Sequence, residues 1–87
     1  MVTRTLEVLN RAGIHARPAS LISSIASKYK SDITIGKETM RINAKSIMGV
    51  ITLGATYGTK LELFVEGDDE ALAADAIETL FKNRFRE

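Results

Sequence analysis

A histidine and an arginine stand two positions apart near the start of the chain, and both side chains suit phosphate chemistry. His15 is the only histidine among 87 residues, and Arg17 is followed directly by the only proline. A neutral imidazole is a nucleophile, and a guanidinium pairs with two oxygens of one phosphate group. The pair therefore indicates a phosphoryl group that is carried by His15 and bound by Arg17. The alternative is a surface or capping histidine beside a solvated arginine.

The segment that follows His15 is predicted to be a helix. Apolar residues recur at three- and four-residue steps between Ala16 and Tyr29, which is typical of a helix with one buried face. The free N–H groups at the start of such a helix favour an anion and disfavour an imidazolium ring. Pro18 falls in the first turn, where a missing N–H costs least. We therefore expect the backbone of Ala16 and Arg17 to bind phosphoryl oxygens beside a neutral His15 ring.

A second helix is predicted to start at Ser46. This serine precedes an apolar run that ends at Gly54; serine is a preferred N-cap residue, and glycine commonly ends a helix. A short helix on a sheet buries one side only. If Val50 and Leu53 pack inward, three apolar side chains stay partly exposed, and such clusters mark interaction sites. The three residues are Ile47, Met48 and Ile51. The alternative is that the loop over residues 55–59 covers them.

The exposed side of the first helix is predicted to be a further docking surface. Arg17, Ser20 and Ser24 share the side that faces away from the apolar stripe, and Leu21 lies at its edge as an exposed leucine. Small side chains around an arginine leave room for a partner protein to approach. We therefore expect Ser20, Leu21 and Ser24 to contact partners.

The remaining elements are predicted from alternating and helical residue patterns. The alternating segments are residues 2–8, 33–35, 40–42 and 60–66, and a turn over 36–38 joins the middle two with their apolar side toward the core. The last helix opens with acidic residues at 68–70 and continues through Leu72, Ala73, Ala76, Ile77 and Leu80. This order predicts the α+β class. We expect an open-faced β-sandwich in βαββαβα order, in which a four-stranded antiparallel sheet has three helices on one face and water on the other.

Composition excludes several classes of function. The length predicts one domain over residues 1–87. With 12 basic and 11 acidic side chains the net charge is +1, so the cationic surface of a nucleic-acid-binding protein is missing. There is no cysteine and no metal-ligand spacing, so we expect no metal and no cofactor. The start has no apolar signal segment, and no apolar run approaches the ~20 residues of a membrane span. We therefore expect a cytoplasmic protein without membrane contact.

Two short motifs resemble those of a known family. GIHARPA at residues 13–19 resembles the active-site signature of HPr, the histidine-containing phosphocarrier protein of the bacterial phosphoenolpyruvate-dependent phosphotransferase system. KSIMG at residues 45–49 resembles the regulatory serine motif of the same family. The resemblance covers essentially the whole chain, and two motifs at the family's spacing are more specific than one. Ile14 stands where the family more often has leucine.

The resemblance implies a phosphoryl carrier rather than an enzyme. It implies that enzyme I, which takes the phosphoryl group from phosphoenolpyruvate, phosphorylates Nδ1 of His15, and that the group then passes to an EIIA domain during sugar uptake. It also implies phosphorylation of Ser46 by an ATP-dependent HPr kinase/phosphorylase, with a transcription regulator as a further partner. The expected state is a monomer.

Three alternatives remain at this point. FKNRF at residues 81–85 is similar to the tails of some Gram-negative carriers, including the nitrogen-related branch, so a carrier that regulates without sugar transport is one alternative to sugar uptake. A protein that acts only through phosphorylated Ser46 is the second alternative. The third is an RNA-binding module, because a similar order of strands and helices builds RNA-recognition domains. Those domains need stacking aromatic residues, and Phe64 is the only aromatic residue predicted on the open sheet face.

Overall fold

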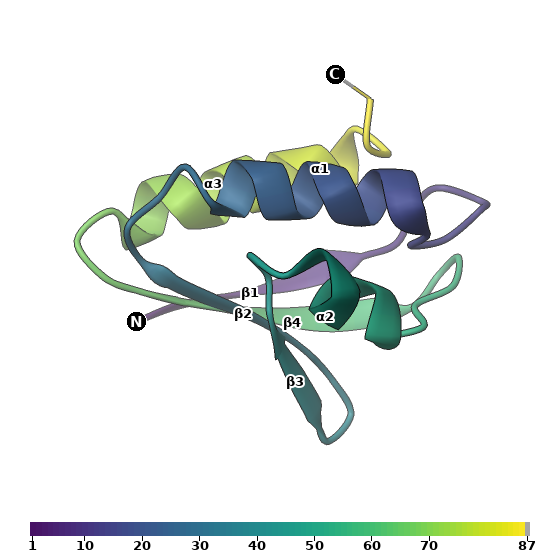
Figure 1. The fold of residues 1–87 in the computed structure, drawn as a ribbon, viewed down its shortest axis with the longest axis horizontal. Coiled ribbons are helices and arrows are strands. Elements are labelled where there is room, and N and C mark those ends of the chain that lie inside the picture. Colours follow the sequence, from purple (N-terminus) through teal and green to yellow (C-terminus); the bar gives the residue numbers. More distant parts are fainter. Residues whose placement is uncertain (87) are drawn as a thin grey trace.

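The structure is a computed structural model that describes residues 1–86. Its elements are β1 (Val2–Glu7), α1 (Ala16–Ala26), β2 (Asp32–Lys37), β3 (Met40–Asn43), α2 (Ile47–Thr52), β4 (Lys60–Glu66) and α3 (Glu70–Lys82). The strands form one sheet in the order β1-β4-β2-β3, and every neighbouring pair is antiparallel. The three helices lie on the same side of the sheet (Figure 1). The predicted α+β class and the βαββαβα order are confirmed.

Alternating side chains of the strands build the core beneath the helices. Strand β4 lies between β1 and β2 and buries Leu61, Leu63 and Val65, whereas Glu62 and Glu66 stay exposed. This alternation is expected when one face of a sheet is packed and the other meets water. The helices supply buried residues from the other side, which are Ala19, Ile22 and Ala26 of α1 and Ala73, Ala74, Ile77, Leu80 and Phe81 of α3. The packed sheet gives the loops at its ends a fixed platform.

Helix α1 ends earlier than the sequence predicts. After Ala26 the chain makes tighter bonds, from the Lys28 N–H to the Ile25 carbonyl at 3.1 Å and from the Tyr29 N–H to the Ala26 carbonyl at 3.2 Å. These bonds span three residues instead of four, which is common where a helix ends. Ile25 and Tyr29 are therefore half-buried beside the core rather than inside it.

The hairpin between β2 and β3 turns later than predicted. The expected turn over 36–38 is wrong, because β2 continues through Lys37 and the turn begins at Glu38. Glu38 has a φ of 56°, in a region that glycine normally occupies. Pairing of β2 with β4 ends at Gly36, so the tip of the hairpin extends past the sheet. Met40 is consequently 45% exposed instead of facing the core.

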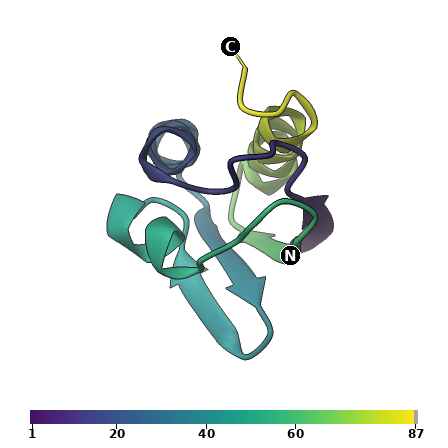
Figure 2. The same ribbon diagram turned by 90° about the vertical axis from the view of Figure 1, so that its right-hand side faces the viewer.

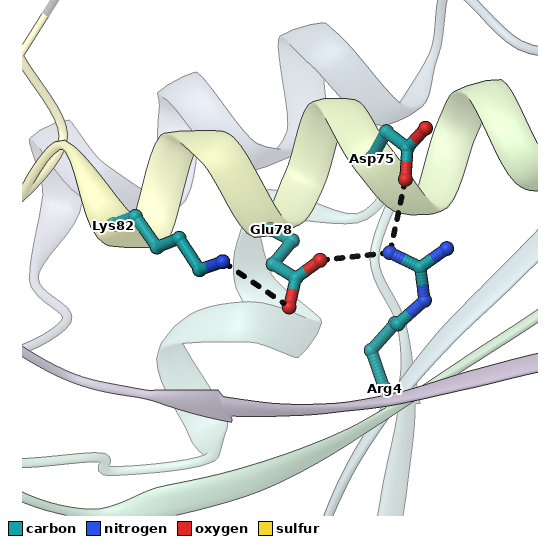
Figure 3. Close-up of polar contacts among 4 residues, drawn as sticks. All are labelled: Arg4, Asp75, Glu78 and Lys82. Carbon is teal, nitrogen blue, oxygen red and sulfur yellow. Dashed lines mark hydrogen bonds and ion pairs between the residues drawn. The ribbon is translucent and has the colours of Figure 1, made fainter.

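Charged side chains tie β1 to α3 (Figure 3). Nη1 of Arg4 donates to Oδ1 of Asp75 at 2.9 Å and to Oε1 of Glu78 at 2.7 Å. Nζ of Lys82 lies 3.8 Å from Oε2 of Glu78. The hydrogen bonds that Arg4 donates to Asp75 and Glu78, together with the negative charges of these carboxylates, raise the pKa of Arg4. The contacts connect the edge strand to the helix that covers it.

One apolar residue of α3 lies outside the buried face. Leu72 is 67% exposed, whereas Ala73, Ile77 and Leu80 are buried. Successive residues of a helix are about 100° apart, so a face centred on Ala73, Ile77 and Leu80 leaves Leu72 at its side. Helix α3 has 13 residues, and no helix within residues 1–86 combines the length and the apolar character that crossing a membrane requires.

Candidate functional site

The loop that leads into α1 is held by backbone contacts. Nδ2 of Asn10 donates to the Gly13 carbonyl at 2.7 Å, and the Gly13 N–H donates to the Asn10 carbonyl at 3.1 Å. Gly13 has a φ of 75°, and a Cβ at this position would lie 2.8 Å from the Ala55 carbonyl oxygen. The Ile14 N–H donates to the same carbonyl at 2.9 Å, and the Ile14 side chain is buried. These contacts fix the backbone directly before His15.

His15 is the N-cap residue of α1, and its ring makes no hydrogen bond to the helix. Its backbone is extended, with φ −117° and ψ −163°, and the side chain is exposed. The His15 carbonyl accepts the first helical bond from the Ala19 N–H at 2.9 Å. Because Pro18 has no N–H, the free donors at this helix start are those of Ala16 and Arg17, which have no acceptor within residues 1–86. An exposed imidazole therefore lies next to two free N–H groups.

The outer side of α1 carries the other residues that the sequence analysis assigns to this surface. Arg17, Ser20 and Ser24 are exposed, and Arg17 has no ion pair within the described part of the chain. The expected exposure of Leu21 is wrong, because this side chain is half-buried against the core. Position 21 adjoins Pro18 and Ile25 on the helix surface, and Pro18 is buried. Only part of the leucine is accessible to a partner.

Ser46 is the N-cap residue of α2, as predicted, and its hydroxyl caps the helix. Its backbone is extended, with φ −101° and ψ 116°. Oγ accepts a hydrogen bond from the Gly49 N–H at 3.0 Å, and the Ser46 carbonyl accepts from the Val50 N–H at 3.0 Å. The side chain is exposed all the same. The hydroxyl is thus both a structural cap and a surface group.

The short helix α2 leaves a small apolar patch in solvent. Ile47 is 43% exposed and Met48 is 68% exposed, while Ile51 is half-buried. Val50 and Leu53 face inward and are buried. The predicted division of this helix into buried and partly exposed apolar residues is confirmed. We refer to Ile47, Met48 and Ile51 as the α2 patch.

The loop after α2 bonds to the end of β1 and to the loop before α1. The Val8 N–H donates to the Thr59 carbonyl at 3.0 Å, and the Gly58 N–H donates to the Val8 carbonyl at 2.8 Å. Ala55 accepts the bond from Ile14 described above. The alternative in which residues 55–59 cover the α2 patch is therefore wrong for the exposed Ile47 and Met48.

A pair of hydrogen bonds joins α1 to the segment before Ser46. Oγ of Ser23 donates to the Lys45 carbonyl at 2.6 Å, and Nζ of Lys45 donates to the Tyr29 carbonyl at 2.9 Å. Helices α1 and α2 lie side by side (Figure 2). The sequence analysis missed this contact, although a serine next to Ile22 on the buried face of α1 was a signal for it. The start of α1 and the start of α2 consequently belong to one connected pair of helices.

The open face of the sheet offers little for stacking with nucleic-acid bases. The guanidinium carbon of Arg41 lies 3.7 Å from the centre of the Phe64 ring, and Nη2 of Arg41 donates to Oγ1 of Thr34 at 3.3 Å. A Cβ at Gly36 would lie 3.3 Å from Cγ of Arg41 and 3.4 Å from Cε2 of Phe64, so both side chains pack over this glycine. Since Arg41 occupies the ring of the one aromatic residue on this face, the geometry does not support the RNA-binding alternative.

Two carboxylates with lowered pKa values, Asp69 and Glu70, lie at the other end of the molecule, where α3 starts (Figure 1). Hydrogen bonds from the Ser31 hydroxyl and from the Lys30 backbone lower the pKa of Asp69. A hydrogen bond from the Gly67 N–H lowers the pKa of Glu70. Among residues 1–86, no three His, Cys, Asp or Glu side chains come together as ligands for a metal ion. The groups near the starts of α1 and α2 that could take part in chemistry are a histidine, a serine and helix N–H groups.

Comparisons with known proteins agree on one family. A family model described as "PTS HPr component phosphorylation site" matches residues 2–83. The Phosphocarrier protein HPr of Treponema pallidum (strain Nichols) is 56% identical over 87 residues, which cover 100% of this chain and 99% of that protein. The Phosphocarrier protein HPr of Xylella fastidiosa (strain Temecula1) is 40% identical over 87 residues, with coverage of 100% and 98%. The crystal structure of HPr-C-His from Thermoanaerobacter tengcongensis superimposes with a TM-score of 0.95 at 44% identity and covers 100% of this chain and 98% of that one.

Proposed function

The chain belongs to the HPr family of phosphocarrier proteins of the phosphotransferase system, and from this premise we propose that His15 is the residue that carries the phosphoryl group. The observation that supports this proposal most is the geometry at the start of α1. The His15 ring is exposed and makes no hydrogen bond to the helix, and the N–H groups of Ala16 and Arg17 beside it have no acceptor within residues 1–86. Such a helix start binds an anion, so its N–H groups can hold the phosphoryl oxygens once His15 carries the group.

In the proposed transfer, the lone pair of Nδ1 of His15 attacks the phosphorus atom carried by phosphorylated enzyme I. The new nitrogen–phosphorus bond forms while the bond between phosphorus and the donor atom breaks, and the donor keeps that electron pair. The phosphoryl oxygens then accept hydrogen bonds from the Ala16 and Arg17 N–H groups, and the Arg17 guanidinium pairs with two of them. The same exchange in the other direction passes the group to an EIIA domain.

We propose Ser46 as the regulatory site. An ATP-dependent HPr kinase/phosphorylase would join Oγ of Ser46 to the γ-phosphorus of ATP, with release of ADP and of the hydroxyl proton. The added charge of about −1.5 to −2 stands at the positive end of α2, so the helix tolerates it. The α2 patch, which directly follows Ser46, is proposed to dock enzyme I together with Ser20, Leu21 and Ser24. A phosphate at the edge of this surface weakens docking because it loses water against an apolar partner.

The proposed physiological role is sugar uptake through the EIIA domain. A transcription regulator that contacts the phosphorylated Ser46 region is a further proposed partner. All residues assigned to transfer and regulation lie in one chain and in the connected pair α1 and α2, so a monomer within one domain is sufficient for these functions.

Labelling with radioactive phosphoenolpyruvate and enzyme I tests the role of His15. We expect the unmodified protein to gain an acid-labile, base-stable label, as a phosphoramidate does. His15→Ala is expected to gain none, while Ser46→Ala is labelled normally and controls for folding and for enzyme I activity. Arg17→Ala is expected to be labelled more slowly, because the two N–H groups remain. An acid-stable label, or a labelled His15→Ala variant, would overturn the assignment.

The role of Ser46 is tested by the rate of labelling and by the affinity for enzyme I. We expect phosphorylated Ser46, and more weakly Ser46→Asp, to raise the enzyme I concentration needed for half-maximal labelling, while Ser46→Ala behaves like the unmodified protein. A phosphoserine form that binds enzyme I as well as the unmodified protein, or that unfolds at a much lower temperature, would contradict the docking explanation.

A further inference from the structure

A hollow lined by arginines lies at the end of the molecule where α1 starts. Its volume is about 390 Å³, and its lining residues are Leu9, Asn10, Arg11, Tyr57, Arg84 and Arg86. Figure 2 looks onto this end, where the loop after β1 passes between the C-terminal turn above and the loop before β4 below. The three arginines therefore come from two segments that are far apart in the sequence and adjacent in space.

The C-terminal turn has a strained backbone that a buried side chain holds in place. Arg84 has a φ of 57° and Phe85 has a φ of 62°, which non-glycine residues rarely adopt. Phe85 is 5% exposed, and its ring packs edge-on against Phe81 with 4.8 Å between the ring centres. The Phe85 N–H donates to the Leu80 carbonyl at 3.0 Å. Because Phe85 is anchored, the arginines on either side of it, Arg84 and Arg86, are both directed to the wall of the hollow.

Among residues 1–86, the lining of the hollow contains three guanidinium groups and no carboxylate. A neighbouring hollow of about 510 Å³ shares Leu9, Arg84 and Arg86 and adds Lys82 to the basic surface. The ion pairs formed within residues 1–86 do not include Arg11, Arg84 or Arg86. Like charges that converge on one hollow repel one another, and an anion placed between them relieves that repulsion.

Two further contacts favour a phosphate ligand. The guanidinium carbon of Arg11 lies 5.8 Å from the centre of the Tyr57 ring, a contact that restricts where its planar group points. Oδ1 of Asn10 is buried without a hydrogen-bond partner among the described residues, while its Nδ2 is occupied by Gly13. Asn10 itself lines the hollow, and guanidinium groups bind phosphate oxygens in pairs.

We propose that this hollow binds a small polyanion with two linked phosphate groups, at a site separate from His15. A single phosphate matches one guanidinium fork, whereas two linked phosphates offer oxygens to more than one of the three arginines that line the hollow. The site requires neither phosphorylation of His15 nor the docking of a partner protein.

The experiment is an NMR titration of the ¹⁵N-labelled full chain with inorganic pyrophosphate, and with inorganic phosphate for comparison. We expect saturable shifts of the backbone signals of residues 9–11, 57 and 84–86, and weaker binding of phosphate than of pyrophosphate. Arg84→Gln should raise the dissociation constant for pyrophosphate about tenfold, as expected for the loss of one charged hydrogen-bonding group. Two control variants, Arg41→Gln and Arg17→Gln, lose the same charge as Arg84→Gln. Comparing the three separates binding in the hollow from attraction of pyrophosphate by the net charge of the chain.

Arg41→Gln removes a charge on the open sheet face, and Arg17→Gln removes one at the start of α1. Neither side chain lines the hollow, and 0.1 M salt weakens the attraction of exposed charges outside it, so both variants should bind pyrophosphate within about twofold of the unmodified chain. Equal losses in all three variants would show attraction by net charge alone and overturn the proposal. If only Arg17→Gln lost affinity for pyrophosphate, the anion would bind at the α1 start, and the proposal would also be overturned. The proposal would be overturned too if the backbone signals showed no saturable shifts.

Discussion

Helix α1 starts at His15 and helix α3 starts at Asp69, and neither N-cap side chain bonds to its own helix. The Asp69 carboxylate accepts hydrogen bonds from the Ser31 N–H at 3.0 Å, the Ser31 hydroxyl at 2.5 Å and the Lys30 N–H at 2.9 Å. The His15 ring has no such bond to α1 and remains exposed. One side chain is occupied in joining α3 to the turn before β2, and the other is free to form a bond.

The difference shows how the proposed phosphoryl acceptor is positioned without being used as a structural contact. At the α3 start, the Asp69 carboxylate holds the turn by accepting charge-assisted bonds. At the α1 start, residues other than the N-cap hold the chain, through Gly13, the Asn10 amide and the bond from Ile14 to Ala55. A side chain that makes no structural bond can gain and lose a phosphoryl group without changing the fold. The predictions that follow separate backbone support from side-chain support.

The largest effect on stability is expected from Gly13→Ala. The added Cβ would lie 2.8 Å from the Ala55 carbonyl oxygen, on a backbone with a φ of 75°. We expect the free energy of unfolding in urea to fall by about 3 kcal/mol, from overpacking combined with the left-handed backbone. Gly54→Ala is the matched control, since Gly54 has a φ of 60° but no atom within 4 Å of an added Cβ. It should cost only about 1 kcal/mol. Equal losses in the two variants would mean that close packing at Gly13 does not hold the α1 start.

At the α3 start, Asp69→Asn should lower the melting temperature by several degrees. The neutral amide loses the charge assistance in the bonds from Ser31 and Lys30, and its NH₂ group faces donors. Asp68→Asn is the matched control, because Asp68 is exposed and makes no side-chain hydrogen bond within residues 1–86. Calorimetry of both variants at pH 7 checks the difference. If Asp69→Asn and Asp68→Asn had equal melting temperatures, the bonds of the Asp69 carboxylate would not stabilise the α3 start.

The contribution of Asp69 should also disappear in acid. Its pKa is lowered by the hydrogen bonds from Ser31 and Lys30, so the folded state holds the ionised form more strongly than the unfolded state does. The stabilisation is complete above the unfolded pKa of about 3.9 and is lost as the pH falls through the lower folded pKa. The difference in melting temperature between the unmodified chain and Asp69→Asn should therefore shrink below about pH 4. A difference that stays constant down to pH 2 would contradict this linkage.

Ser46 is intermediate between these two N-caps, because its exposed hydroxyl caps its own helix. Ser46→Ala removes the bond from the Gly49 N–H and should lower the free energy of unfolding by about 1 kcal/mol. Ser46→Asp keeps an acceptor at the cap and should lose less. Ser24→Ala is the control, since it lies exposed inside α1, where alanine is the better helix former. If urea unfolding gave Ser46→Ala and Ser24→Ala the same free energy of unfolding, the Ser46 hydroxyl would not cap α2 in solution.

Local patterns allowed much of the fold to be predicted. The alternation of Leu61, Leu63 and Val65 gives the bounds of β4, and the serine before an apolar run gives the start of α2. Both signals arise from residues near in sequence. The turn at Glu38 was misplaced because a non-glycine residue in the left-handed region is rare, and the pattern favoured the nearby glycine instead.

Contacts between distant segments could not be predicted in this way. The bond from Ser23 to Lys45 spans 22 residues, and the bonds from Ser31 to Asp69 span 38. Arg11 meets Arg84 and Arg86 only after the ends of the chain come together. The order of elements limits the possible topologies but does not determine which loop touches which. For the candidate site, the residues at both helix starts were therefore accessible from the sequence, whereas the contacts that hold them were not.

The smallest effect on stability is expected at His15, and it is the sharpest test of the comparison. Since the ring makes no bond to α1, His15→Ala should change the free energy of unfolding by less than about 0.5 kcal/mol, as for most exposed positions. His15→Asp should raise it by about 0.5 to 1 kcal/mol, because an aspartate at the N-cap can accept from the free Arg17 N–H and suits the positive helix end. Pro18 offers no further N–H, which limits the gain. Urea unfolding of both variants beside Asp69→Asn measures these effects. A loss of more than about 1 kcal/mol in His15→Ala would mean that the His15 ring is a structural contact at the start of α1.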